Sequence, residues 1–209
     1  MKAVGIIAEY NPLHYGHIHH INKAIQLAGS DAVVVAMSGD YIQRGEPAIL
    51  DKWERCELAL KHGADLVIEI PAVFCLSDAS TYAKAGVALL ENIPAVNSIA
   101  FGSECGDVEL LEDVASKLQM NSKEIKDRIS QLTKGGISFP RARESAFRDM
   151  FGKAGADVLS NSNDIRILRI IIIMHPLKPS SSPTIANIKS VCGSEIKLPF
   201  LTEPTSLFL

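Results

Sequence analysis

The sequence predicts an α/β fold in which helices cover both faces of a doubly wound, mostly parallel sheet, followed by a helical extension. Two observations carry this prediction. Short, nearly continuous apolar runs recur in the first half of the 209-residue chain, as is typical of strands buried on both faces. Segments with helical apolar spacing alternate with these runs, and the links between them are short.

Local signals mark the boundaries of the expected elements. Gly29 and Gly63 follow expected helices, where glycine commonly ends a helix. Pro71 stops an expected strand. In chain order, the expected strands are residues 3–8, 32–37, 66–70 and 98–101, and the expected helices are residues 17–27, 52–62 and 80–92.

The strand pattern ends near residue 106. Three helices are expected next, at residues 108–118, 122–132 and 140–151, and we expect them to pack against the sheet domain. Residues 166–174, RILRIIIIM, are interpreted as one more buried strand. The rest of the chain holds half of the ten prolines and shows little periodicity, so we expect it to be loosely ordered.

Charge is unevenly distributed along the chain. The formal net charge is −3, which does not indicate a general nucleic-acid binder, but residues 121–153 carry eight basic and four acidic side chains. This basic segment has two interpretations. It could hold a phosphate backbone, or it could be a solvated helix pair, which is the commoner case.

The composition excludes several classes of protein. The apolar runs fall far short of the ~20 residues that a membrane span requires, and the N-terminus has no signal-peptide pattern. We therefore expect a cytoplasmic protein with no membrane partner; the sequence gives no oligomeric state. The four cysteines lack C-x-x-C spacing, so we expect no disulfide framework and no metal site formed by protein ligands alone.

The first candidate site follows the first strand, in the sequence His14-Tyr15-Gly16-His17. The first turn of a helix presents unpaired N–H groups and the positive end of the helix dipole, which together favour an anion such as phosphate. His14 and His17 are three residues apart, so both imidazoles can lie on one face of the helix as catalytic groups. We expect both to titrate near neutral pH, and His20 is a weaker candidate. Two such histidines are more often ordinary surface or core residues, but ligands of open α/β sheets bind beyond the carboxyl ends of strands.

Two further blocks follow the second and fourth strands. Polar candidates for substrate or phosphate binding in residues 37–55 are Ser38, Gln43, Arg44, Lys52 and Arg55. Surface ion pairs, such as Lys52 with Glu54, are an equally good interpretation of these charges. In Phe101-Gly102-Ser103-Glu104, the glycine would let a nucleoside lie against the backbone, and Glu104 would bind ribose or Mg²⁺ or cap a helix.

Together, the blocks EYNPLHYGHIHHI, MSGDYIQRGEPAILDKWERCELAL, DLVIEIP and FGSE resemble the bacterial tRNA(Met) cytidine acetate ligase family, over residues 1–165. The resemblance implies a Rossmann-like nucleotidyltransferase fold. It also implies an enzyme that activates acetate with ATP and Mg²⁺ as acetyl-adenylate and forms N4-acetylcytidine at the wobble position of elongator tRNA(Met). The residues that it implies for ATP binding are Ile7, Ala8, Glu9, Tyr10, Asn11, His14, Gly16, His17, His20, Gly102 and Asn163.

The sequence pattern divides the chain into three expected parts. These are a nucleotide-binding α/β domain (residues 1–106), a helical extension packed on it (residues 107–165) and an atypical Pro/Ser-rich tail (residues 166–209). After Asn163-Asp164-Ile165 the sequence departs from the family pattern, and we interpret the chain as a truncated or frame-shifted copy. Two alternatives stay open: another nucleotidyltransferase that acts on a small phosphorylated acceptor, and a remnant that binds ATP or RNA without turnover.

Overall fold

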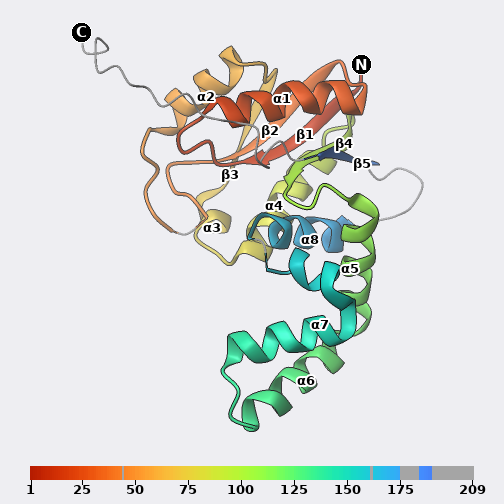
Figure 1. The fold of residues 1–209 in the computed structure, drawn as a ribbon. Coiled ribbons are helices and arrows are strands. Elements are labelled where there is room, and N and C mark those ends of the chain that lie inside the picture. The colour runs from red at the N-terminus through yellow and green to blue at the C-terminus, as the bar shows by residue number, and fades with distance from the viewer. Residues whose placement is uncertain (44, 161, 175–183, 190–209) are drawn as a thin grey trace, which may run out of the picture.

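A parallel sheet with the strand order β3-β2-β1-β4-β5 forms the centre of the computed structural model (Figure 1). The structure describes residues 1–43, 45–160, 162–174 and 184–189. The chain builds the sheet outward from β1 to β3 and then returns to place β4 on the other side of β1, so the strand order reverses between β1 and β4. The predicted α/β class is confirmed. The strands are β1 (Ala3–Ala8), β2 (Ala32–Ser38), β3 (Leu66–Ile70), β4 (Val96–Ser103) and β5 (Thr184–Lys189).

Alternate residues of the central strands feed two separate hydrophobic layers. Val4 and Ile6 of β1 pack with α1, whereas Ala3 of the same strand packs on the opposite face with α4. This is the two-residue periodicity of a strand that is covered on both sides. The helices of the sheet domain are α1 (Tyr15–Ala28), α2 (Lys52–Lys61), α3 (Ala72–Cys75) and α4 (Ala79–Glu91).

The remaining helices extend away from the sheet (Figure 1). They are α5 (Val108–Met120), α6 (Ser122–Lys134), α7 (Phe139–Val158) and α8 (Ser162–Met174). Helices α5 and α8 share a hydrophobic cluster with the end of β4. Helix α6 and the first part of α7, up to a kink at Gly152, project from the sheet domain; we call residues 122–151 the α6–α7 arm.

The expected strand at residues 166–174 is wrong, because these residues belong to α8. A short apolar run fits a buried strand and a buried helix equally well, and periodicity alone does not separate them. The run folds as a helix because it is enclosed: Ile170 contributes to the layer shared with α4, and Leu168 and Ile171 pack with α5. The expected domain boundary after residue 165 therefore falls inside one helix.

Part of the expected tail belongs to the sheet. Strand β5 pairs in parallel with β4, with Thr184 opposite Ser98 and Lys189 opposite Ser103. The expectation of loose order for residues 175–183 and 190–209 concerns residues outside the described part of the chain. Within the part that the structure describes, no helix combines the length and the apolar character needed to cross a membrane.

Candidate functional site

The two histidines of the first motif meet at the start of α1. His14 caps the helix, and its Nδ1 accepts a hydrogen bond from the backbone N–H of Gly16 at 3.1 Å. The Nδ1 of His17 accepts one in return from the N–H of His14 at 3.3 Å. The two rings stack, with centroids 3.6 Å apart and planes 23° apart. The sequence placed both rings on one face of the helix, and the structure brings them into direct contact there.

The hydrogen bonds of this pair define the tautomer of each ring. A neutral imidazole carries one proton, and a ring nitrogen that accepts a hydrogen bond cannot hold it. Because Nδ1 accepts in both His14 and His17, the proton of each neutral ring lies on Nε2. Each neutral ring therefore carries its N–H donor on Nε2, the nitrogen that does not face a backbone amide.

The expected near-neutral titration is corrected for His17. Burial, followed by the nearby imidazoles of His14 and His20, lowers the pKa of His17 from its ordinary value of 6.5 to about 4. His17 is consequently a neutral donor at pH 7 rather than a partly charged one. A neutral imidazole still donates a hydrogen bond through its N–H group to a developing negative charge.

Gly16 is required by the position of the His14 ring. A Cβ atom at Gly16 would lie 3.0 Å from Cε1 and 3.1 Å from Nδ1 of His14, closer than ordinary van der Waals contact. The absence of a side chain therefore lets the imidazole fold over the first turn and accept the Gly16 amide. The sequence interpretation assigned Gly16 to ligand approach, whereas the structure adds this local packing reason.

The segment between β1 and α1 is held by its own side chains. Glu9 accepts the N–H of Gln43 at 3.1 Å, and Asn11 accepts the N–H of Ile49 at 2.7 Å. Tyr10 is buried with a positive φ of 47°, and its ring centroid lies 5.0 Å from that of His17. These implied nucleotide-binding residues thus also fix the loop after β1 against the loop after β2.

The remaining implied residues lie around the same edge of the sheet. Ile7 and Ala8 are half-buried at the end of β1, where the Ala8 carbonyl accepts the hydroxyl of Tyr82 at 3.2 Å. His20 is partly buried on α1, and burial lowers its pKa to about 4 against the opposing effect of the Phe101 backbone. Its Nε2 is buried and has no hydrogen-bond partner among the described residues.

The end of β4 faces the end of β1 across the point where the strand order reverses. Gly102 is exposed, and a Cβ atom placed on it would meet no atom within 4 Å. Buried Asp164 of α8 accepts hydrogen bonds from the Ser103 hydroxyl at 2.7 Å and the Glu104 amide at 2.9 Å. This link fixes the start of α8, and hence the backbone of Asn163, beside the end of β4. The side chain of Asn163 lies outside the described residues.

Arg55 and Ser38 are interior residues, which differs from their expected role in substrate contact. Arg55 is fully buried. Its guanidinium donates to the Leu50 carbonyl at 3.1 Å, to the Glu9 carbonyl at 2.6 Å and to the Gly39 carbonyl. Ser38 is also fully buried, 3.5 Å from Arg55. The two residues therefore stabilise the loops after β1 and β2 from the protein interior.

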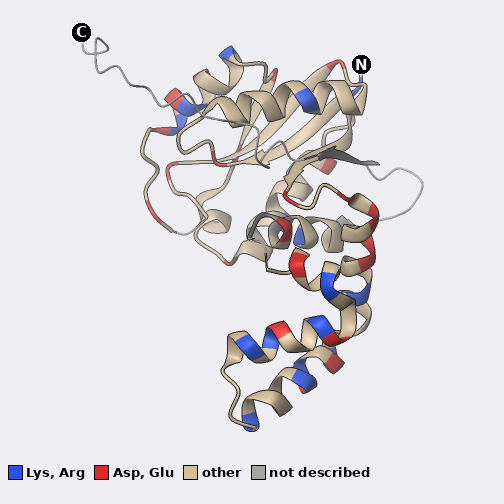
Figure 2. Ribbon diagram, in the orientation of Figure 1, with Lys and Arg blue, Asp and Glu red and all other residues tan. Residues whose placement is uncertain are grey.

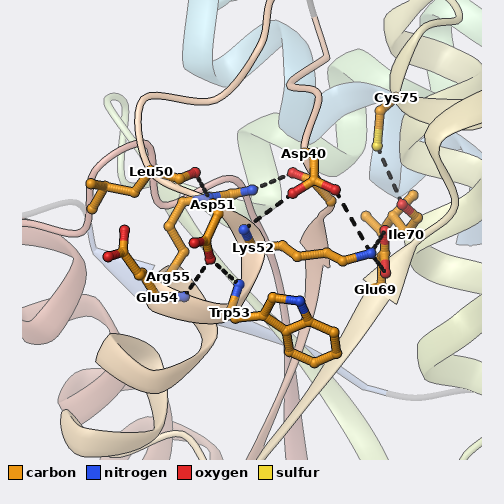
Figure 3. A network of polar contacts seen from close by, with 11 residues as sticks. Asp40, Leu50, Asp51, Lys52, Trp53, Glu54, Arg55, Glu69, Ile70 and Cys75 are labelled. Atoms are coloured by element: carbon orange, nitrogen blue, oxygen red, sulfur yellow. Dashed lines mark hydrogen bonds and ion pairs between the residues drawn. The ribbon is translucent and has the colours of Figure 1, made fainter.

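The other candidates of this block have mixed outcomes. Gln43 is half-buried and bonded through its backbone, and Arg44 lies outside the described residues. Lys52 stays accessible, and its ammonium contacts Glu69 at 2.9 Å and Asp40 at 3.8 Å rather than pairing with Glu54 (Figure 3). β3 is an edge strand, and Glu69 on it is exposed. Sequence reasoning missed Glu69, although a carboxylate near the end of an expected strand was a signal that could have found it. In the described residues, no group of three or more His, Cys, Asp or Glu side chains could hold a metal ion.

The geometry thus places two imidazole side chains and the positive end of the α1 dipole at the switch point of a doubly wound sheet, where small ligands of this architecture bind. A model of the HIGH nucleotidyl transferase family matches residues 1–185. The chain belongs to this family. The match continues beyond residue 165, where the motif-based resemblance ended.

The relatives and structures most similar to the chain include tRNA(Met) cytidine acetate ligases. The protein of that name from Clostridium novyi (strain NT) is 45% identical over 167 residues, which cover 79% of this chain and 42% of that protein. The one from Caldanaerobacter subterraneus subsp. tengcongensis is 40% identical over 199 residues, 95% of this chain and 50% of that protein. The chain spans about half the length of the curated relatives that it matches. The Thermotoga maritima TmcAL crystal structure with bound alpha-thio ATP has a TM-score of 0.78 at 37% identity, and the match covers 92% of this chain and 47% of that one.

Proposed function

We propose that this protein is an ATP-dependent acetate ligase that forms N4-acetylcytidine at the wobble position of elongator tRNA(Met) through an acetyl-adenylate. One observation carries the proposal: the stacked pair of His14 and His17 presents two Nε2–H donors beside the first turn of α1, at the switch point of the sheet. The similarity to proteins named tRNA(Met) cytidine acetate ligase supports this choice of substrates. Because the proposed substrate is a tRNA, we expect the protein to be cytoplasmic.

In this proposal ATP lies across the ends of β1 and β4. Its phosphates approach the positive end of the α1 dipole and the Nε2–H groups of His14 and His17. Its nucleoside lies against the exposed backbone at Gly102, near Asn163. The unpartnered Nε2 of His20 is a polar atom that a ligand at this edge could satisfy. Mg²⁺ would enter as the ATP complex, held by the phosphate oxygens, and would neutralise charge on the leaving pyrophosphate.

The adenylation step requires stabilisation of negative charge. An acetate oxygen attacks the α-phosphorus of ATP, the bond to the bridging oxygen breaks, and pyrophosphate leaves. Charge develops on the α-phosphate and the bridging oxygen, where the Nε2–H groups of His14 and His17 donate hydrogen bonds and the positive end of the α1 dipole adds support. In the second step the cytidine N4 amine attacks the acetyl carbonyl and AMP leaves, and here the protein acts mainly by holding the reactants together.

A single substitution tests the role of the pair. We expect His17→Ala to lower acetate-dependent pyrophosphate exchange by about 100-fold or more, the usual effect of removing one donor to a developing anion. The same substitution at His62, which lies at the end of α2, is the matched control and should leave the exchange near the wild-type rate. Circular dichroism checks that both variants are folded. Wild-type exchange in His17→Ala would remove the histidine from the mechanism.

The alternatives are separated by the same assay. A transferase that acts on a small phosphorylated acceptor would release pyrophosphate with that acceptor and not with acetate. A protein that binds ATP without turnover would bind ATP at equilibrium and release no pyrophosphate with either. Detection of N4-acetylcytidine in tRNA incubated with the protein, ATP and acetate would establish the whole reaction.

A further inference from the structure

A second group of polar and aromatic side chains lies at the same edge of the sheet, outside the histidine pair. We call Asp40, Lys52, Trp53 and Glu69 the Lys52 cluster (Figure 3). The Lys52 ammonium lies 2.9 Å and 3.2 Å from the two oxygens of Glu69 and 3.8 Å from Asp40. It also lies 5.5 Å from the centre of the Trp53 ring.

The indole of the cluster is largely free of other protein atoms. Trp53 is 73% exposed, although burial of so large an apolar ring would be favourable. Lys52 contacts the ring as a cation over its face. An exposed aromatic ring beside hydrogen-bonding groups is the arrangement on which unpaired nucleobases stack.

The cluster follows β2 and β3 at the same edge of the sheet at which the histidine pair follows β1. Asp40 is the second residue after the end of β2, Glu69 is the next-to-last residue of β3, and β2 is hydrogen-bonded to β1. Adjacent strands are about 4.8 Å apart, so the end of β3 is about 10 Å from the end of β1. The bond from Ile49 to Asn11 ties the loop before α2 to the segment that leads into His14.

The charges of the cluster disfavour an anionic ligand. Two carboxylates surround one ammonium, so the cluster is net negative and would repel acetate or a phosphate. Gly39 keeps this arrangement open, because a Cβ atom there would collide with the Glu69 carboxylate. The hydrogen bond to Glu69 raises the pKa of Lys52, so the ammonium remains a charged donor. A flat ligand with an N–H₂ group beside an acceptor atom would complement the exposed ring, the carboxylates and the ammonium.

Cytosine has this pattern of groups. Its N4 amine donates, as carboxylate side chains require, and its N3 and O2 atoms accept. Uracil has a carbonyl in place of the amine and would face the carboxylates with an acceptor. We propose that the Lys52 cluster is the binding site for the acceptor cytosine: the base stacks on Trp53, its N4 amine donates to Glu69 and Asp40, and its ring acceptors face Lys52. This assignment rests on the proposed function, because it supplies the base on which the acetyl group is placed.

The chain contains a single tryptophan, so the proposed contact has its own optical signal. The protein is titrated with a stem–loop RNA that carries one cytidine in its loop, and with the same RNA carrying uridine there, while Trp53 fluorescence is followed. We expect saturable quenching with a dissociation constant about tenfold lower for the cytidine RNA. Absence of quenching, or equal affinity for both RNAs, would overturn the proposal.

Variants separate stacking from base discrimination. Glu69→Gln should bring the two affinities closer together, since an amide can turn its N–H₂ group toward the uracil carbonyl. Trp53→Ala should lower kcat/KM for tRNA acetylation about tenfold or more, and Trp53→Phe should restore most of it because a ring is retained.

A parallel measurement of acetate-dependent pyrophosphate exchange, which involves no RNA, keeps the two proposals apart. An equal loss of exchange and of acetylation in Trp53→Ala would assign the residue to the adenylate step and contradict a cytosine site. Selective quenching by the cytidine RNA in a protein without exchange activity would leave the Lys52 cluster standing and refute the proposed ligase function.

Discussion

Charged residues have different surroundings at the carboxyl edge of the sheet and on the α6–α7 arm (Figure 2). At the edge, Arg55 and Asp164 are fully buried and bind groups that are 46 and 60 residues away in the sequence, Glu9 and Glu104. On the arm, Arg148 pairs with Glu144 one helical turn away, and both side chains are more than half exposed. The edge uses charge to fix loops in place, whereas the arm presents charge to solvent.

The arm also contains a hollow that is separate from the histidine pair. A hollow of about 720 Å³ lies where α5, α6 and α7 meet, and the exposed pair of Arg128 and Asp149 lines it together with two methionines and other polar or charged side chains. None of the residues around His14 or Lys52 lines this hollow. The exposed ion pairs favour the interpretation of the basic segment as a solvated helix pair.

The largest expected effect on stability comes from the edge. Arg55→Met should lower the free energy of unfolding by about 3–5 kcal/mol, because it leaves the carbonyls of Glu9, Leu50 and Gly39 buried without their donor. Urea unfolding followed by circular dichroism measures this change. A loss below about 1 kcal/mol would show that water replaces the guanidinium. Charged residues at the edge would then contribute no more to stability than those on the arm.

The second largest effect on stability is expected at acidic pH. The pKa values of His17 and His20 are about 4 in the fold, against 6.5 when unfolded, so the unfolded chain binds more protons between these values. The contribution of these two histidines to the free energy of unfolding is fully present above pH 6.5. It falls by roughly 2 kcal/mol, after allowance for partial exposure, as the pH drops toward 4. Melting temperatures measured from pH 7 to pH 4.5 test this. His20→Gln should flatten the decline, and an equal decline in that variant would point to other groups.

The smallest effect is expected on the arm. Arg148→Met removes one exposed ion pair and should change the free energy of unfolding by less than about 0.5 kcal/mol. The same urea experiment serves for this variant, and the helix former Met keeps the local helix propensity similar. A loss as large as that of Arg55→Met would erase the contrast between the two regions.

Much of the site was predictable because it is local. The spacing of His14 and His17 on one helical turn, and their position after a strand, are properties of a few consecutive residues. The contact between the rings and the proton on Nε2 were not predictable, since they depend on how each Nδ1 meets a backbone amide. Lys52 and Arg55 looked alike in sequence, yet one is accessible and the other is buried.

The sequence by itself determined the alternation of strands and helices, the two apolar faces of β1 and β2, and the polar loops at the strand ends, because period and turn chemistry are local properties. Only the tertiary structure decided that residues 166–174 form a helix and that residues 184–189 add a strand beside β4. It also decided that Arg55 supports loops from within and that Glu69 meets Lys52. Each of these depends on which distant segments enclose a residue, and burial against distant neighbours outweighs local preference.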